Sequence, residues 1–257
     1  MNDSVITALC ELVCDTSLGK SDTMSGVSIG EALQSQAAEA LAGFTKSEYP
    51  PKVVALCARQ LLEMFGTSLL SRIDPLRVSA LQTLQSSGHY DSHRRNKLTI
   101  QWSGDILPKD DGGDVSISYI KDVEPEKLNR ALFSNLTDKI LWRPSLQKIQ
   151  AYIGDKQTLS IWEEEFIDAD AETFVKKYSP QLNNCYSYLS KGIHSDWVDR
   201  PVESYQMSEV KTQIGVALKI ITYFSAAISC ATLVRKNIDI PTIATYFSCI
   251  ENEFKDY

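Results

Sequence analysis

The stretch VALKIITYFSAAISCATLV, Val216–Val234, decides the fold. With the residues just before it, it carries apolar side chains in alternating steps of three and four, at Val210, Ile214, Ala217, Ile221, Phe224, Ile228 and Ala231. A second apolar stripe lies on another face of the same helix, at Val216, Ile220, Tyr223 and Ala227. This pattern predicts a helix over 208–235 that is buried on two sides, as the central helix of a bundle is.

The same stretch is about as long as a bilayer span, so a membrane helix is the alternative. Lys219 lies inside the stretch, and Ser225, Ser229 and Thr232 dilute its apolar character. Because the stripes also continue on the N-terminal side of the stretch, we favour a helix of a soluble bundle.

Composition supports a soluble globular protein. The chain has 257 residues, of which 43% are hydrophobic and 23% charged. Its net charge of −7 argues against a general nucleic-acid-binding surface and leaves room only for a local basic patch. The six cysteines show no CxxC spacing, and the N-terminus has no basic signal-peptide region. We therefore expect reduced, buried thiols in a cytoplasmic protein.

The middle of the chain has a different periodicity from its two ends. Leu98, Ile100 and Trp102 alternate with polar residues, and 115–119 does the same after a turn-rich loop at 108–113. This alternation predicts a β-hairpin, with 158–162 as a third strand. The expected fold class is mainly α, a helical bundle with a small antiparallel β-hairpin insertion.

Three regions follow from this change in pattern. We expect an N-terminal helical region at 1–96, a β-containing central region at 97–165 and a C-terminal helical bundle at 166–257. Within the last region, Pro180 is expected to open one helix and Pro241 the final one.

His194 is the first candidate for chemistry. It follows a predicted helix and lies near Asp196 and Asp199. An imidazole oriented by a carboxylate can act as a general acid or base. The plainer alternative is a histidine that closes the helix by bonding to a backbone carbonyl.

The segment YLSKGIH that ends at His194, followed by a loop and the long apolar helix, resembles the HEPN domains of prokaryotic defence and toxin systems. In that family four to six residues separate an arginine from the histidine that follows it, and active members are metal-independent ribonucleases that pair as dimers. His194 matches the histidine, whereas Ser187, Tyr188 and Leu189 stand where the arginine would be. The resemblance implies a HEPN-like helical fold in 166–257 without the complete catalytic motif.

A basic run just before the predicted hairpin is the second candidate. Arg94, Arg95 and Lys97 could bind the phosphates of a nucleic acid. The alternative is a solvated basic edge that guards a strand. His89 and His93 are four residues apart, but the stretch is not expected to be helical and no further ligands lie nearby, so no metal site is predicted.

An acidic run is the third candidate. Its residues are Glu163, Glu164, Glu165 and Asp168, followed by Asp170 and Glu172. Clustered acids can hold Mg²⁺ in nucleases, but the lysine of the usual nuclease pattern is missing. A docking surface for a basic partner, or a solvated loop, is the better interpretation.

The functional expectation follows from these residues and from the resemblance. We expect a non-catalytic accessory subunit of a multi-protein bacterial antiphage defence complex, which bridges or regulates a partner nuclease or ATPase. Its partners would be other protein subunits, with nucleic acid reached through the complex, and no cofactor is expected. A HEPN-type ribonuclease that uses His194 is the alternative.

Overall fold

The computed structural model describes residues 3–15, 29–45, 49–76, 78–79, 132–133, 137–156, 159–191 and 206–255. Its helices are α1 (Asp3–Val13), α2 (Ile29–Thr45), α3 (Pro51–Ile73), the π-helix η1 (Asp138–Trp142), α7 (Arg143–Gly154), α8 (Ile161–Ile167), α9 (Phe174–Lys191), α10 (Met207–Ser229) and α11 (Ile240–Phe254). These ranges hold helices, turns and connecting segments but no strand.

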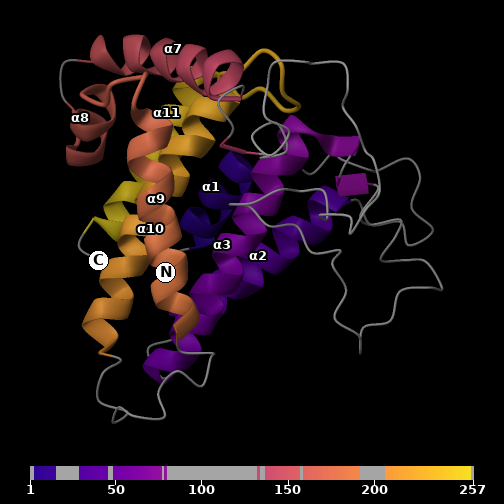
Figure 1. The fold of residues 1–257 in the computed structure, drawn as a ribbon, viewed down its shortest axis with the longest axis vertical. Helices are drawn as coiled ribbons and strands as arrows, with labels where there is room; N and C mark the ends of the chain where they lie inside the picture. The colour runs from indigo at the N-terminus through magenta and orange to yellow at the C-terminus, as the bar shows by residue number, and fades with distance from the viewer. Residues whose placement is uncertain are drawn as a thin grey trace, which may run out of the picture.

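The helices form a bundle around α10. Helix α10 packs against α9, α11 and α3, and α7 lies across one end of the bundle with α8 beside it (Figure 1). Helix α1 lies inside the molecule, where it contacts α10 and α11 on one side and the α2–α3 pair on the other. The first and last parts of the chain therefore contribute to one hydrophobic core.

The two-sided burial predicted for the long apolar helix is confirmed. Every residue from Ile220 to Ser229 in α10 is buried. Tyr223 and Phe224 point to different neighbours: Tyr223 stacks on Phe247 of α11, with ring centroids 5.8 Å apart, and Phe224 meets Phe174 of α9 edge-on at 5.1 Å. Aromatic pairs of this kind add to the stabilisation from apolar burial.

Helix α10 ends at Ser229, earlier than the predicted limit of 235. The N–H of Cys230 bonds back to the carbonyls of Ala227 and Ile228, which tightens the last turn. Ala231 and Val234 remain buried beyond the helix. Apolar periodicity therefore continues past the helix end and could not reveal it.

The predicted fold class needs a correction. Its mainly α part is confirmed, but the small antiparallel sheet is not found, since the ranges that the structure describes contain no strand. The hairpin strands at 98–102 and 115–119 lie outside those ranges. The third strand, at 158–162, is wrong: Ser160 is the N-cap of α8, and its hydroxyl accepts from the N–H of Glu163 while the Glu163 side chain accepts from the N–H of Ser160. This capping box starts a helix.

The prediction that Pro180 opens a helix is wrong, because Pro180 lies inside α9. The helix begins at Phe174 because Phe174, Val175 and Tyr178 are buried against the core before the proline is reached. Proline costs a helix one backbone hydrogen bond, and apolar burial of the preceding turn offsets that cost here.

Within the described ranges, two helices are long and apolar enough to cross a membrane by length and composition alone. They are α3 and α10, whose most apolar windows are 56% and 78% buried within the fold. Core helices of soluble proteins pass the same test, so this is weak support for a membrane span. The cytoplasmic location stays a prediction.

Candidate functional site

Only the acidic run among the predicted sites lies in described parts of the chain. His194, Arg94, Arg95 and Lys97 fall outside them, so their proposed roles in catalysis and nucleic-acid binding stay predictions.

Two acids of the run are engaged by other side chains of the fold. Glu163 is 3% exposed, and besides its part in the capping box it forms an ion pair with Lys156. Glu165 accepts from Lys219 Nζ at 2.7 Å and from the Tyr178 hydroxyl at 3.3 Å. Burial and the adjacent Glu165 charge raise the pKa of Tyr178. Glu165 thus ties α8 to α9 and α10, and Glu163 ties α8 to the segment that follows α7.

The other acids lie at the surface. Glu164 is exposed on α8, Asp168 is exposed at its C-cap, and Asp170 and Glu172 are exposed in the turn that follows. The N–H of Glu172 and the hydroxyl of Thr173 bond to Asp170, which lowers the pKa of Asp170. The structure thus places four exposed carboxylates at the corner between α8 and α9.

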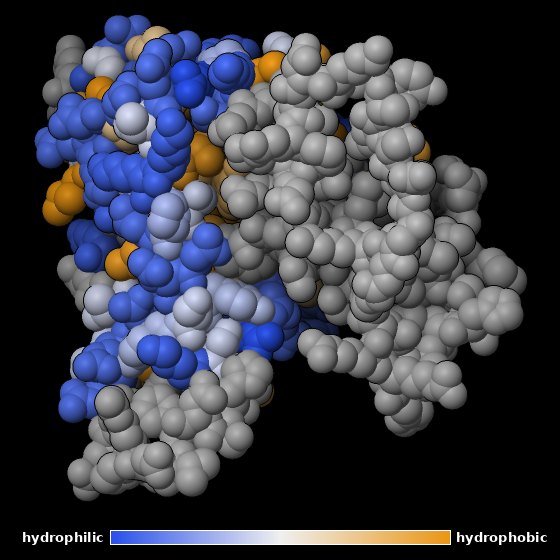
Figure 2. Space-filling view, viewed as in Figure 1, coloured by the Kyte–Doolittle hydropathy of each residue, from blue (hydrophilic) through white to orange (hydrophobic). Residues whose placement is uncertain are grey.

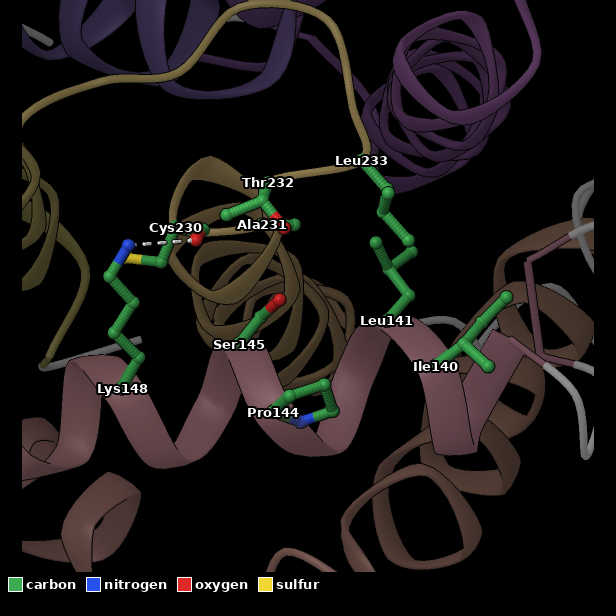
Figure 3. A pocket seen from close by; sticks show the side chains of 9 residues that line it. All are labelled: Ile140, Leu141, Pro144, Ser145, Lys148, Cys230, Ala231, Thr232 and Leu233. Atoms are coloured by element: carbon green, nitrogen blue, oxygen red, sulfur yellow. Dashed lines mark hydrogen bonds between the residues drawn. The ribbon is translucent and has the colours of Figure 1, made fainter.

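A pocket lies between η1–α7 and the segment that follows α10. Its volume is about 160 Å³, and its lining consists of Ile140, Leu141, Pro144, Ser145, Lys148, Cys230, Ala231, Thr232 and Leu233. In Figure 3, Leu233 and Leu141 point toward each other at one end, the Ser145 hydroxyl points toward the segment opposite, and Lys148 lies at the other end.

Large apolar side chains reach solvent at the rim of this pocket. Leu233 is 71% exposed and Ile140 is 51% exposed. On the face seen in Figure 2, by contrast, the described residues are mostly hydrophilic and hydrophobic ones appear in small, separate places. Exposed apolar side chains grouped around a hollow are typical of protein-binding surfaces.

Among the described residues that line the pocket, Lys148 alone is charged. Its Nζ donates to the carbonyl of Cys230 at 3.4 Å, which is long for a hydrogen bond. The ammonium is therefore held weakly in place and can bind a stronger acceptor.

A second polar site, at the ends of three helices, is buried. Arg72 is fully buried in the last turn of α3 and donates to Leu12 O (2.7 Å), Ser229 Oγ (3.1 Å), Lys236 O (2.7 Å) and Arg235 O (3.4 Å). All four acceptors are uncharged oxygens. Burial lowers the pKa of Arg72 to about 10, opposed by the nearby Asp15 charge.

Arg235 and Lys236, whose carbonyls accept from Arg72, complete the site with their own side chains. Lys236 has a φ of 56° and donates from Nζ to Glu11 Oε2 at 2.8 Å and to the carbonyls of Glu11 and Cys14 at 2.8 and 2.9 Å. Arg235 Nε lies 3.0 Å from Asp15 Oδ2. We call Arg72, Arg235, Lys236 and residues 11–15 the helix-end junction. Its cations bind the carbonyl end of α1, where the helix dipole favours positive charge.

A buried carboxylate binds the N-terminal end of a helix, where free N–H groups lie. Glu251 of α11 is 3% exposed, and its Oε1 accepts from the Trp162 N–H of α8 at 3.0 Å. Its Oε2 is buried without a hydrogen-bond partner. Gln150 of α7 holds the far end of α8 by donating to the carbonyls of Phe166 and Ala169, both at 2.7 Å.

All six cysteines are free thiols. Burial raises the pKa of Cys10 to about 12 and those of Cys185 and Cys230 to about 11, so these thiols are poor nucleophiles near neutral pH. No group of three or more His, Cys, Asp or Glu side chains that could hold a metal was found within the described ranges.

Sequence reasoning missed the pocket and the helix-end junction. A weak signal for each was present. Arg72 interrupts the apolar end of α3 (SLLSRI), and Leu233 lies off both apolar stripes of 208–235. Neither signal says which distant residue each side chain meets.

Comparisons with known proteins add no relative. No family model matches the chain, and neither the curated proteins nor the solved structures gave a match.

Proposed function

We propose that this protein is a non-catalytic accessory subunit of a multi-protein bacterial antiphage defence complex, in which it bridges or regulates a partner nuclease or ATPase in the cytoplasm. The observation that carries its role as a protein-binding subunit is the pocket with Leu233 and Ile140 exposed at its rim. Side chains of this size gain free energy when a partner removes them from water, at roughly 25 cal/mol per Å² of apolar surface.

The acidic corner between α8 and α9 offers a second surface for a partner. Glu164 and Asp168 were proposed for partner binding with Glu163 and Glu165, and the two exposed ones are free to reach a basic partner. Exposed charges of this kind steer association and set specificity more than they add affinity.

The defence setting rests on the HEPN resemblance of the C-terminal region. In that setting the missing arginine before His194 favours a subunit that retains the helical scaffold and works through its partners.

Purification from the native host tests the proposal. The tagged chain, expressed with its neighbouring genes, should bring down a partner in fixed stoichiometry. Replacing Ile140 and Leu233 by Ser should reduce recovery of that partner. Val53→Ser with Leu56→Ser is the matched control, because these apolar residues are also exposed but lie on α3.

A protein that stays solitary under native expression would contradict the proposal. Incubation with RNA in the absence of metal tests the alternative directly. Cleavage by the wild type that disappears in His194→Ala would assign a ribonuclease instead.

A further inference from the structure

The pocket beside α7 has the dimensions of a single side chain. At about 160 Å³ it is close to the size of cavities that hold one benzene ring, and it is well below the usual range for small-molecule sites, about 300–1,000 Å³. Ile140, Leu141 and Leu233 supply apolar contacts at one end. One aromatic or large aliphatic side chain would therefore fill it.

The charged side chain that the structure describes in the pocket lining is positive. Lys148 lines the pocket, exposed Lys139 precedes Ile140 in the chain, and the described lining residues include no Asp or Glu. Because Lys148 Nζ makes only a 3.4 Å contact with the Cys230 carbonyl, a carboxylate could replace that acceptor at little cost. A charged acceptor gives a shorter and stronger bond than a carbonyl.

We infer that this pocket takes a bulky apolar side chain of a partner protein, presented beside a carboxylate that pairs with Lys148. This inference rests on the proposed protein-binding function and names the chemistry of the partner segment. The apolar anchor supplies most of the affinity, as buried anchors do at protein interfaces, and the carboxylate sets the register.

Fluorescence anisotropy with labelled peptides tests the inference. The probe is a short Gly/Ser peptide with one phenylalanine between glutamates, and its controls replace the phenylalanine by serine or the glutamates by glutamine. The phenylalanine–glutamate peptide should bind at least about tenfold more tightly than the serine control, and about threefold more tightly than the glutamine control.

Two protein variants locate the binding. Thr232→Trp covers the pocket from an exposed position and should weaken binding about tenfold, whereas Thr212→Trp, exposed at the start of α10, should not. Lys148→Glu should weaken binding about threefold or more, whereas Lys176→Glu, exposed on α9, should leave it unchanged.

Three results would overturn the inference. They are the absence of binding at millimolar peptide, equal binding of the phenylalanine and serine peptides, and a dimer in solution that Thr232→Trp dissociates, which would give the surface to a second copy of this chain. If the peptides fail while the native partner is still recovered through Ile140 and Leu233, the proposed function stands and only the partner chemistry is wrong.

Discussion

Arg72 and Glu251 are both buried ionisable side chains that bind helix ends, yet they differ in how fully they are hydrogen-bonded. Arg72 donates to four oxygens: one at the end of α1, the Ser229 hydroxyl at the end of α10, and two carbonyls in the segment that follows α10. Glu251 accepts one N–H at the start of α8 and leaves Oε2 without a hydrogen-bond partner. Burying a polar group is costly unless it is hydrogen-bonded. The fold therefore supplies hydrogen-bond acceptors all round the Arg72 guanidinium, whereas it supplies a donor to only one oxygen of the Glu251 carboxylate.

The largest effect is expected from Arg72→Met. The substitution keeps a long apolar side chain but leaves the Leu12 and Lys236 carbonyls buried without their donor, so we expect the free energy of unfolding to fall by about 3–5 kcal/mol. Urea denaturation followed by circular dichroism measures this. The free energy of unfolding of Arg72→Lys should lie between those of the wild type and Arg72→Met, since an ammonium reaches fewer of the four acceptors. A loss below about 1 kcal/mol for Arg72→Met would remove the contrast with Glu251.

Glu251 should be less sensitive, and the effect should depend on the substitution. Glu251→Ala removes the acceptor of the Trp162 N–H, and we expect a loss of about 1–3 kcal/mol in the free energy of unfolding. Glu251→Gln keeps an acceptor and removes the charge, so its loss should be smaller. The same urea titration compares them. If Glu251→Gln is as damaging as Arg72→Met, the charge of Glu251 stabilises the fold beyond its one bond to Trp162, and the contrast with Arg72 is wrong.

Lys236→Gly separates backbone strain from side-chain bonding in the helix-end junction. Glycine favours the φ of 56° at this position, but it loses the bonds from Nζ to Glu11 and Cys14. The two effects oppose each other, so we expect a net loss of about 1 kcal/mol in thermal or urea unfolding. Lys236→Ala loses the bonds and keeps the strain, and should be the less stable of the two.

The smallest effect is expected at Asp239, an exposed carboxylate that caps α11. It accepts from the side chain and the N–H of Thr242, and these bonds lower its pKa from 3.8. A carboxyl with a lowered folded pKa stabilises the fold above its unfolded pKa, and this contribution is lost as pH falls through the folded pKa. The difference in unfolding midpoint between wild type and Asp239→Asn should therefore shrink in acid. A difference that is constant from pH 7 to pH 3 would contradict this.

Local patterns predicted the helices well because they depend on nearby residues. The stripes of α10 and the proline at the start of α11 are such signals. The third strand failed because five residues, 158–162, fit either period, and only the Ser160–Glu163 spacing favoured a helix. Neither the junction around Arg72 nor the pocket could be predicted. Their contacts join residues that only the folded chain brings together, such as Arg72 with Leu12 and Lys148 with Cys230.

The bond from Lys236 to the carbonyl of Glu11 spans 225 positions of sequence. On a ribosome that adds about 5–20 residues per second, α1 waits roughly 10–45 s before Lys236 is even made. During that interval the apolar side chains of Leu9, Leu12 and Val13, all buried in the finished protein, have no α10 or α11 to cover them. Helix α1 thus waits for α10 and α11 although it is made before the other described helices, and a nascent chain stalled before residue 235 would present its uncovered side to chaperones and proteases.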